Sequence, residues 1–250
     1  MTVNVIAEIG SNWEGDIKLG KLHIKKSKEC GATHVKFQMW RAEDIYELSD
    51  PNWKTIKKSE LKEDVAEELK NYADEIGIKW FCSVFNPESV DFLESINVKL
   101  YKIASWTTAL KHRFSLETIQ KVGKTKKLTF ISTGNGINKK LIEKQFRKKD
   151  FQYTYCIAKY PALDKDIVWK DILKYDFFSD HTLGYTIPLA YTALKKSLGK
   201  NDIYIEKHVK LDTSRGPDAP FSITFDELRT LIDHVRRIDQ LNMSIPNSLS

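Results

Sequence analysis

The sequence predicts a single (β/α)₈ barrel, an α/β TIM-barrel fold, and three observations lead to that prediction. Short apolar, β-branched or aromatic segments recur along the chain, and a segment with helical periodicity follows each of them. Eight such pairs occur, which favours a closed parallel barrel over an open sheet. The length of 250 residues is typical of one such domain.

The predicted strands are short and fairly evenly spaced. They lie at about 3–9, 34–38, 79–84, 100–105, 127–133, 153–158, 175–180 and 203–208. The predicted helices lie at about 16–30, 61–76, 87–96, 114–122, 137–148, 164–174, 184–198 and 224–240. No glycine-rich phosphate motif follows the first strand, which disfavours a dinucleotide-binding fold.

One connection is much longer than the others. It runs from Met39 to Glu60 and leaves the carboxyl end of the second predicted strand. Long loops in compact domains are usually functional or disordered, and the carboxyl ends of barrel strands carry the chemistry. We predict a barrel domain over residues 1–241 and a frayed tail over residues 242–250.

The composition indicates a packed domain with a charged outer surface. Apolar residues make up 41% of the chain and aromatic residues 11%, which excludes wholesale disorder. The net charge of +6 comes from lysines interspersed with glutamates, as in residues 18–28 and 60–70. This mixture is typical of solvated helix faces and disfavours nucleic-acid binding, although it can concentrate an anionic small substrate.

The cysteines and the apolar segments bear on the cellular compartment. Cys30, Cys82 and Cys156 lie far apart in apolar segments, so we interpret them as core thiols in a reducing compartment. The amino terminus lacks a signal-peptide pattern, and no apolar run approaches the ~20 residues of a membrane span. We expect a cytoplasmic protein that does not bind membranes.

Polar residues cluster near the carboxyl ends of the predicted strands. Residues two apart on a strand point to the same side. Glu8 ends the first strand and Lys102 lies in the fourth. Burying a lone lysine or glutamate is costly unless it is paired or binds a ligand, so converging charges indicate a site. Three further strands carry polar pairs of this kind, namely Lys36 with Gln38, Ser179 with His181 and Glu206 with His208.

Each residue type suits a particular chemistry. Two histidines on the last two strands suit a divalent metal whose shell is completed by water and substrate oxygens. Glu8 and Glu206 are candidates for proton transfer or for orienting a water molecule. Individually, serines after a strand are also common in turns. The groups suited to holding a phosphate and a carboxylate are Lys36, Lys102, Ser83, Ser105, Ser132 and Ser179.

The chain resembles the sialic acid synthase family in a series of short motifs that occur in the same order. Residues 6–12 (IAEIGSN) are similar to the family's opening, and 216–218 (GPD) to the loop after its eighth strand. The matches cover nearly the whole chain, and the ordered set is highly specific. The strand motifs between them are 36–38 (KFQ), 101–105 (YKIAS), 131–134 (ISTG), 178–184 (FSDHTLG) and 205–208 (IEKH).

The resemblance implies a condensation of phosphoenolpyruvate with a sugar aldehyde, in which phosphate leaves with C–O cleavage. It implies Mn²⁺ or Mg²⁺ at His181 and His208, and Glu8 as the acid/base group near the tetrahedral intermediate. Sugar contacts are implied for Gln38, Tyr160 and Asp218. Phosphoenolpyruvate contacts are implied for Lys36, Ser83, Lys102, Ser105, Ser132 and Ser179.

The chain departs from the family pattern mainly on the sugar side. Family members carry a C-terminal antifreeze-like domain that supplies a sugar-binding arginine to the partner subunit, and this sequence ends with its eighth predicted helix. Thr107, after Trp106, replaces an expected glutamate, Ala158 replaces an asparagine or serine, and Trp13 replaces a histidine. We therefore expect retained chemistry with a changed acceptor. A homodimer or a separate antifreeze-like protein would complete the site.

Three alternatives remain open from the sequence. A class I aldolase would form a Schiff base on Lys102 or Lys36. A metal-dependent hydrolase would use His181 and His208, although the first strand offers no His-x-His motif. The third alternative is a catalytically inactive barrel that binds a sugar or a partner protein. The absence of the antifreeze-like domain from this sequence favours it, but the intact set of charged residues disfavours it.

Overall fold

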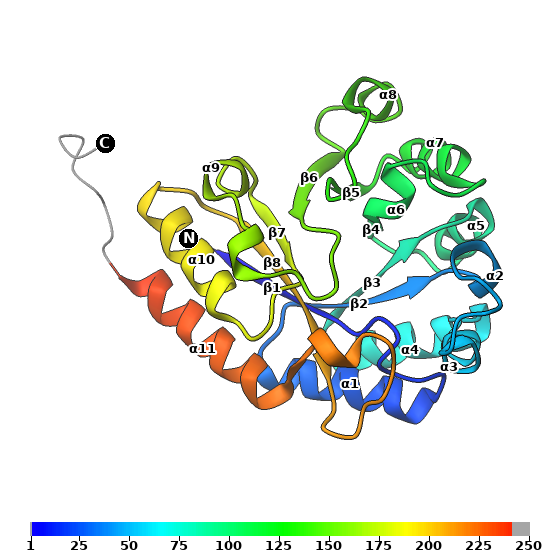
Figure 1. Ribbon diagram of the computed structural model, residues 1–250, viewed down its shortest axis with the longest axis horizontal. Helices are drawn as coiled ribbons and strands as arrows, with labels where there is room; N and C mark the ends of the chain where they lie inside the picture. Colours follow the sequence, from blue (N-terminus) through cyan, green and yellow to red (C-terminus); the bar gives the residue numbers. More distant parts are fainter. Residues whose placement is uncertain (1, 242–250) are drawn as a thin grey trace.

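Eight parallel strands close into a barrel in the computed structural model, which describes residues 2–241 (Figure 1). Neighbouring strands follow the order of the sequence, and β1 pairs with β8 to close the sheet. Glu8 on β1 is in register with Lys36 on β2 and with His208 on β8. The predicted (β/α)₈ fold is therefore confirmed.

The strands match the predicted segments closely. The fourth ends at Ile103, two residues early, because Ala104 caps a helical turn that begins at Ser105. A short ninth strand, which the sequence analysis missed, pairs in parallel with the carboxyl end of β8. The strands are β1 Val3–Glu8, β2 His34–Met39, β3 Lys79–Val84, β4 Leu100–Ile103, β5 Leu128–Ser132, β6 Phe151–Cys156, β7 Phe177–Asp180, β8 Ile203–Lys210 and β9 Ile223–Thr224.

Six long helices form most of the outer layer, and three of them begin at a side-chain cap. Asp16 accepts a hydrogen bond from the Lys18 amide at 2.8 Å to start the first, and Gly31 at φ 91° ends it. The first and last helices lie side by side across the closure of the barrel (Figure 1). The long helices are α1 Ile17–Cys30, α4 Glu63–Glu75, α5 Pro87–Ser95, α7 Ser115–Thr125, α10 Thr186–Ser197 and α11 Phe225–Gln240.

Two of the predicted helices are much shorter than expected. α8 spans only Lys139–Glu143, because the following residues are rich in like charges, such as Lys144 four residues after Lys140. The segment 164–174 holds a single 3₁₀ turn and α9, Trp169–Ile172, since the β-branched residues Ile167 and Val168 adopt extended conformations between them.

The long connection after β2 is folded. It contains α2, Ala42–Ile45, and α3, Trp53–Lys58. The Glu60 carboxylate accepts a hydrogen bond from the Ala42 amide at 2.5 Å, so the two ends of the segment are held together beside the barrel mouth. The predicted tail at 242–250 lies outside the described residues.

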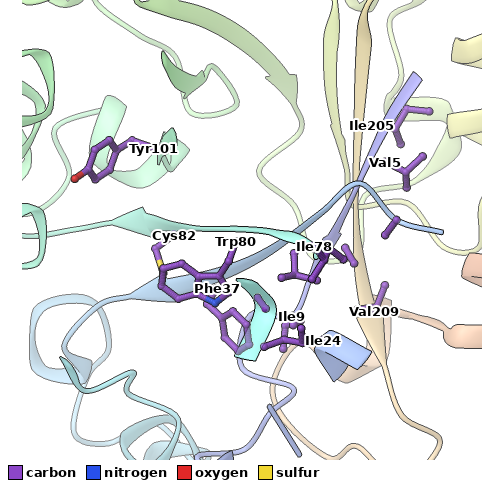
Figure 2. Close-up of a cluster of buried hydrophobic side chains, with 14 of the residues drawn as sticks. Val5, Ile9, Ile24, Phe37, Ile78, Trp80, Cys82, Tyr101, Ile205 and Val209 are labelled. Atoms are coloured by element: carbon purple, nitrogen blue, oxygen red, sulfur yellow. The ribbon is translucent and has the colours of Figure 1, made fainter. Parts of the chain in front are cut away.

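The apolar core occupies three places, one of which is a small cluster of Trp40, Ala42, Ile56 and Phe85 at the connection after β2. One layer fills the space between the sheet and the helices, where the outward side chains of the strands pack (Figure 2). A second cluster plugs the barrel interior with Ile6, Phe81, Phe130 and Phe177. The three cysteines are buried free thiols, as predicted for core residues. Within residues 2–241, no helix is long and apolar enough to cross a membrane.

Candidate active site

A cavity of about 550 Å³ opens at the carboxyl ends of the strands, above the aromatic plug of the barrel. Its size is in the range of small-molecule sites. Every residue predicted for the site lines this cavity except Glu8, which is fully buried behind Lys36 and Gln38. The predicted residues along the wall are Lys36, Gln38, Ser83, Lys102, Ser105, Ser132, Tyr160, Ser179, His181, Glu206, His208 and Asp218.

Two lysines and two glutamates form a buried network at the floor of the cavity. Lys102 Nζ lies 2.5 Å from Glu206 Oε1, and Lys36 Nζ lies 2.7 Å from Glu8 Oε2. Lys36 Nζ is also 3.8 Å from Glu206 Oε1, so the two pairs are connected. Four neighbouring or facing strands contribute these groups, which explains why no local sequence pattern links them.

The environment separates the pKa values of the two carboxyl groups. Burial raises the pKa of Glu8 to about 7, although the Lys36 ammonium opposes the change. Burial would also raise the pKa of Glu206, but the ammonium groups of Lys102 and Lys36 outweigh it and lower that pKa to about 2. Glu206 is therefore ionised at neutral pH, whereas Glu8 exchanges a proton there. Two carboxyls with separated pKa values suit two different roles.

The four serines of the site line the same cavity as the two lysines, and one of them contacts a lysine directly. Ser83 Oγ accepts a hydrogen bond from Lys36 Nζ at 2.9 Å, and Ser179 Oγ donates to Glu206 Oε1 at 2.7 Å. Ser105 Oγ accepts from the Asn135 side chain at 3.2 Å, and Ser132 is buried at the end of β5. Lysine and serine groups in this arrangement can bind an anion with several oxygens.

The two histidines lie on adjacent strand ends with their ring centroids 5.7 Å apart. His181 Nδ1 lies 2.6 Å from the Ile157 carbonyl, so it is the donor in this contact and Nε2 carries the lone pair. Burial lowers the pKa of His181 to about 4 and that of His208 well below its usual value. His208 Nδ1 is buried without a hydrogen-bond partner among the described residues.

These features fit a pair of metal ligands. Metal-bound histidines are neutral and commonly donate their second nitrogen to a carbonyl or carboxylate, as His181 does here. No group of three or more histidine, cysteine or acidic side chains within residues 2–241 is placed to hold a metal. A metal at this position would therefore take its remaining ligands from water and substrate.

Tyr160 and Asp218 are placed over the histidines from two different loops. The Tyr160 ring lies 4.3 Å from the His181 ring, centroid to centroid. Asp218 Oδ2 accepts a hydrogen bond from the Ser11 amide at 2.7 Å and lies 3.9 Å from His208 Nδ1. A Cβ on Gly10, which has φ +52°, would come within 2.2 Å of the Asp218 carboxylate, so the absence of a side chain there permits this approach.

An aromatic and apolar wall lines the outer half of the cavity, and the sequence analysis missed most of it. Trp106, which the sequence singled out, is 38% exposed and lines the cavity. Thr107 does not line it, because its hydroxyl is buried 3.0 Å from His112 Nε2. The long connection after β2 was a signal for Trp40, Ile45 and Tyr46 alone. The missed residues include Trp40, Ile45, Tyr46, Phe85, Asn135 and Phe221.

Sequence comparisons find related proteins over nearly the whole chain. An uncharacterized protein of Methanocaldococcus jannaschii is 33% identical over 95% of this chain and 71% of its own length. A pseudaminic acid synthase of Campylobacter jejuni is 30% identical over 95% of this chain and 74% of its own. The human N-acetylneuraminate-9-phosphate synthase is 29% identical over 94% of this chain and 70% of its own.

Structural comparison gives the same result. The crystal structure of an N-acetylneuraminic acid synthetase from Leptospira borgpetersenii, in complex with citrate, superposes with a TM-score of 0.83 and 25% sequence identity. The similarity covers 100% of this chain and 89% of that one. A sequence model of the NeuB family matches residues 23–245. The chain therefore belongs to the NeuB family.

Proposed function

We propose that this chain condenses phosphoenolpyruvate with a sugar aldehyde to give a 2-keto-3-deoxy sugar acid and phosphate. Relatives in the family are named pseudaminic acid synthase, N,N'-diacetyllegionaminic acid synthase and N-acetylneuraminate-9-phosphate synthase. The observation that supports the proposal most directly is the buried floor of the cavity, where Lys36 and Lys102 face Glu206 among serine hydroxyls.

Phosphoenolpyruvate would bind at this floor through its phosphate and carboxylate. Lys36 and Lys102 provide two positive charges, and Glu206 provides one negative charge. When Glu8 holds its proton, the floor is therefore net positive and suited to an anion. Hydroxyl groups of Ser83, Ser105, Ser132 and Ser179 would complete the hydrogen bonds.

The carbon–carbon bond would form when C3 of phosphoenolpyruvate attacks the carbonyl carbon of the open-chain sugar. This attack leaves positive charge at C2, which the ionised Glu206 carboxylate can stabilise. It also leaves negative charge on the former aldehyde oxygen, which takes up a proton to become a hydroxyl group. A water molecule then adds to C2, and the tetrahedral carbon loses phosphate by breaking its C–O bond. The aromatic wall around Trp40 and Trp106 would exclude bulk water from this step.

Glu8 would accept the proton that the water molecule loses as it adds to C2. It would release this proton when phosphate leaves. Its pKa of about 7 matches that role at physiological pH. Since Glu8 lies behind Lys36 and Gln38, its proton would reach the cavity through the Lys36 ammonium, which can give one proton to the cavity and take another from Glu8, or directly after Gln38 turns toward the sugar. Gln38, Tyr160 and Asp218 are then the proposed sugar contacts.

His181 and His208 would hold Mn²⁺ or Mg²⁺. Such an ion, when bound, would supply a Lewis acid for the aldehyde oxygen. The two neutral imidazoles and the unpartnered His208 Nδ1 support this assignment. We further propose that the protein acts in the cytoplasm, and that either a second copy of the chain or a separate antifreeze-like domain completes the sugar side.

A class I aldolase is the second candidate, and one observation favours it. Burial lowers the pKa of Lys102, as it does for Schiff-base lysines. The same amine, however, is held at 2.5 Å by the Glu206 carboxylate, and a Schiff base would leave the histidine pair without a function. Borohydride trapping with a ketoacid would covalently label Lys102 in an aldolase and would leave the proposed synthase unlabelled.

The proposed chemistry is tested by following the bridging oxygen of phosphoenolpyruvate. Substrate labelled with ¹⁸O at that position is incubated with the protein, Mn²⁺ and an aldose, and the products are examined by mass spectrometry. Cleavage of the C–O bond places the label in the released phosphate. Label retained in the sugar acid would contradict the mechanism, and a barrel without activity would release no phosphate at all.

A further inference from the structure

A further buried ion pair lies on the outer side of the same two strands that carry the histidines. Lys207 on β8 and Asp180 on β7 are register partners, and both side chains are 0% exposed. Lys207 Nζ donates a hydrogen bond to Asp180 Oδ2 at 2.6 Å. Because side chains alternate along a strand, this pair faces the helix layer, whereas Glu206 and His208 face the cavity.

The pair encloses the backbone of His181. Asp180 and Thr182 are the two neighbours of His181, and Lys207 Nζ also donates a hydrogen bond to the Thr182 carbonyl. Asp180 Oδ1 in turn accepts hydrogen bonds from the Thr182 amide at 3.0 Å and from its hydroxyl at 2.9 Å. One ammonium group next to His208 therefore fixes the chain on both sides of His181.

Stability alone does not explain such a pair. Removing two charges from water is costly, and replacing a buried ion pair by apolar residues of similar size is often neutral or stabilising. The position of the pair indicates a different role, since it links the segment that carries His181 directly to the strand that carries His208. Other contacts orient the ring itself, through the bond from His181 Nδ1 to the Ile157 carbonyl.

We infer that Lys207 and Asp180 are positioning residues that hold His181 and His208 at the spacing needed to share one divalent cation. This inference rests on the proposed function of the histidine pair. Groups that orient metal ligands from behind typically change metal affinity by about ten- to a hundredfold when they are removed. The measured quantity is therefore the affinity for Mn²⁺ alone, without substrates.

The test uses the double variant D180N/K207M. The asparagine side chain introduced by D180N keeps an acceptor for the Thr182 amide, and the methionine introduced by K207M fills the lysine's volume without its charge. The chelator-treated protein is titrated with Mn²⁺ and the free ion is followed by electron paramagnetic resonance, while thermal unfolding reports on the fold. We expect about ten- to hundredfold weaker Mn²⁺ binding with a cooperative unfolding transition. Unchanged affinity would overturn the inference.

A matched control is available one element away. Lys195 on α10 is also fully buried and paired with Asp176, next to the opposite end of β7. K195M should leave the Mn²⁺ affinity unchanged, and an equal loss in this variant would show a nonspecific effect and overturn the inference. If the double variant does not fold, D180N alone should still weaken binding several-fold, and an unchanged affinity in D180N would count against the pair.

The wild-type titration separates the two levels of the proposal. Wild-type protein that binds no Mn²⁺ contradicts the metal site, and the role of the ion pair with it. Wild-type protein that binds Mn²⁺ only as tightly as D180N/K207M leaves the metal site in place and contradicts only the role of the pair. Release of phosphate from phosphoenolpyruvate tests the proposed reaction independently of both outcomes.

Discussion

The ammonium group of Lys36 lies 2.7 Å from the carboxylate of Glu8, on adjacent strands at positions in register with each other. Glu8 is completely buried, and burial dominates its protonation even beside this cation, raising its pKa to about 7. The charge at the floor of the cavity therefore changes within the physiological pH range. This has consequences for stability as well as for the reaction.

Glu8 should make the protein less stable as the pH rises. Its pKa is raised from 4.5 in the unfolded chain to about 7, so its favourable contribution is complete below about pH 4.5 and is lost as the pH rises through 7. In E8Q this loss is absent. Between pH 5 and pH 8 we expect the free energy of unfolding of E8Q to gain up to about 3 kcal/mol relative to wild type. Urea unfolding of both proteins at several pH values measures this difference. Parallel dependence of the two unfolding free energies on pH would contradict the raised pKa of Glu8.

Lys102 should be required for binding phosphoenolpyruvate. Removing one partner of a desolvated charge pair typically costs ~2–5 kcal/mol, so K102M should lose most of the affinity seen by calorimetry. Lys99 is exposed near the other end of the same strand, and K99M is the matched control that should bind normally. Unchanged affinity in K102M would count decisively against the proposed floor of the site.

His208 should be required for metal-dependent turnover. H208A removes one of the two proposed ligands, so activity that depends on added Mn²⁺ should disappear, and chelator should have the same effect on the wild type. His234 is exposed on α11, and H234A should keep full activity and metal dependence. Full turnover by a metal-free wild-type enzyme would contradict the assignment.

The sugar aldehyde that this protein condenses with phosphoenolpyruvate should differ from N-acetylmannosamine. Thr107 is buried against His112 and offers no group to the sugar, whereas Trp106 presents its ring to the cavity. W106A should lower kcat/KM for the true aldose by up to about tenfold while leaving the KM for phosphoenolpyruvate unchanged. Hydrogen-bond discrimination between sugars can reach ~10⁴-fold. Efficient turnover of N-acetylmannosamine by this chain alone would refute the prediction.

Much of the floor of the cavity could be predicted from the sequence, because the strands alternate regularly and all run in one direction. Once the strand ends are known, Lys36, Lys102, Glu206 and His208 must point into the same barrel. The ion pairs among them could not be predicted, since they join strands far apart in the chain, such as Lys102 with Glu206.

The outer wall of the cavity was less predictable. The fold of the connection after β2 places Trp40, Ile45 and Tyr46 in this wall. Its two short helices leave no periodic pattern long enough to detect in the sequence. The place of Glu8 behind Lys36 also depends on side-chain packing. The predicted lengths of the helices at α8 and α9 were wrong, because local charge and β-branched residues overrode the apolar periodicity.

The most direct test of the proposed reaction is release of inorganic phosphate from phosphoenolpyruvate with Mn²⁺ against a panel of aldoses, including hexoses, pentoses, N-acetylmannosamine and diacetamido hexoses. We expect phosphate to appear only when an aldose is present, in equal amount to a new 2-keto-3-deoxy sugar acid, with one class of aldose strongly preferred. Phosphate release that is independent of any aldose, or none with the whole panel, would contradict a condensing enzyme.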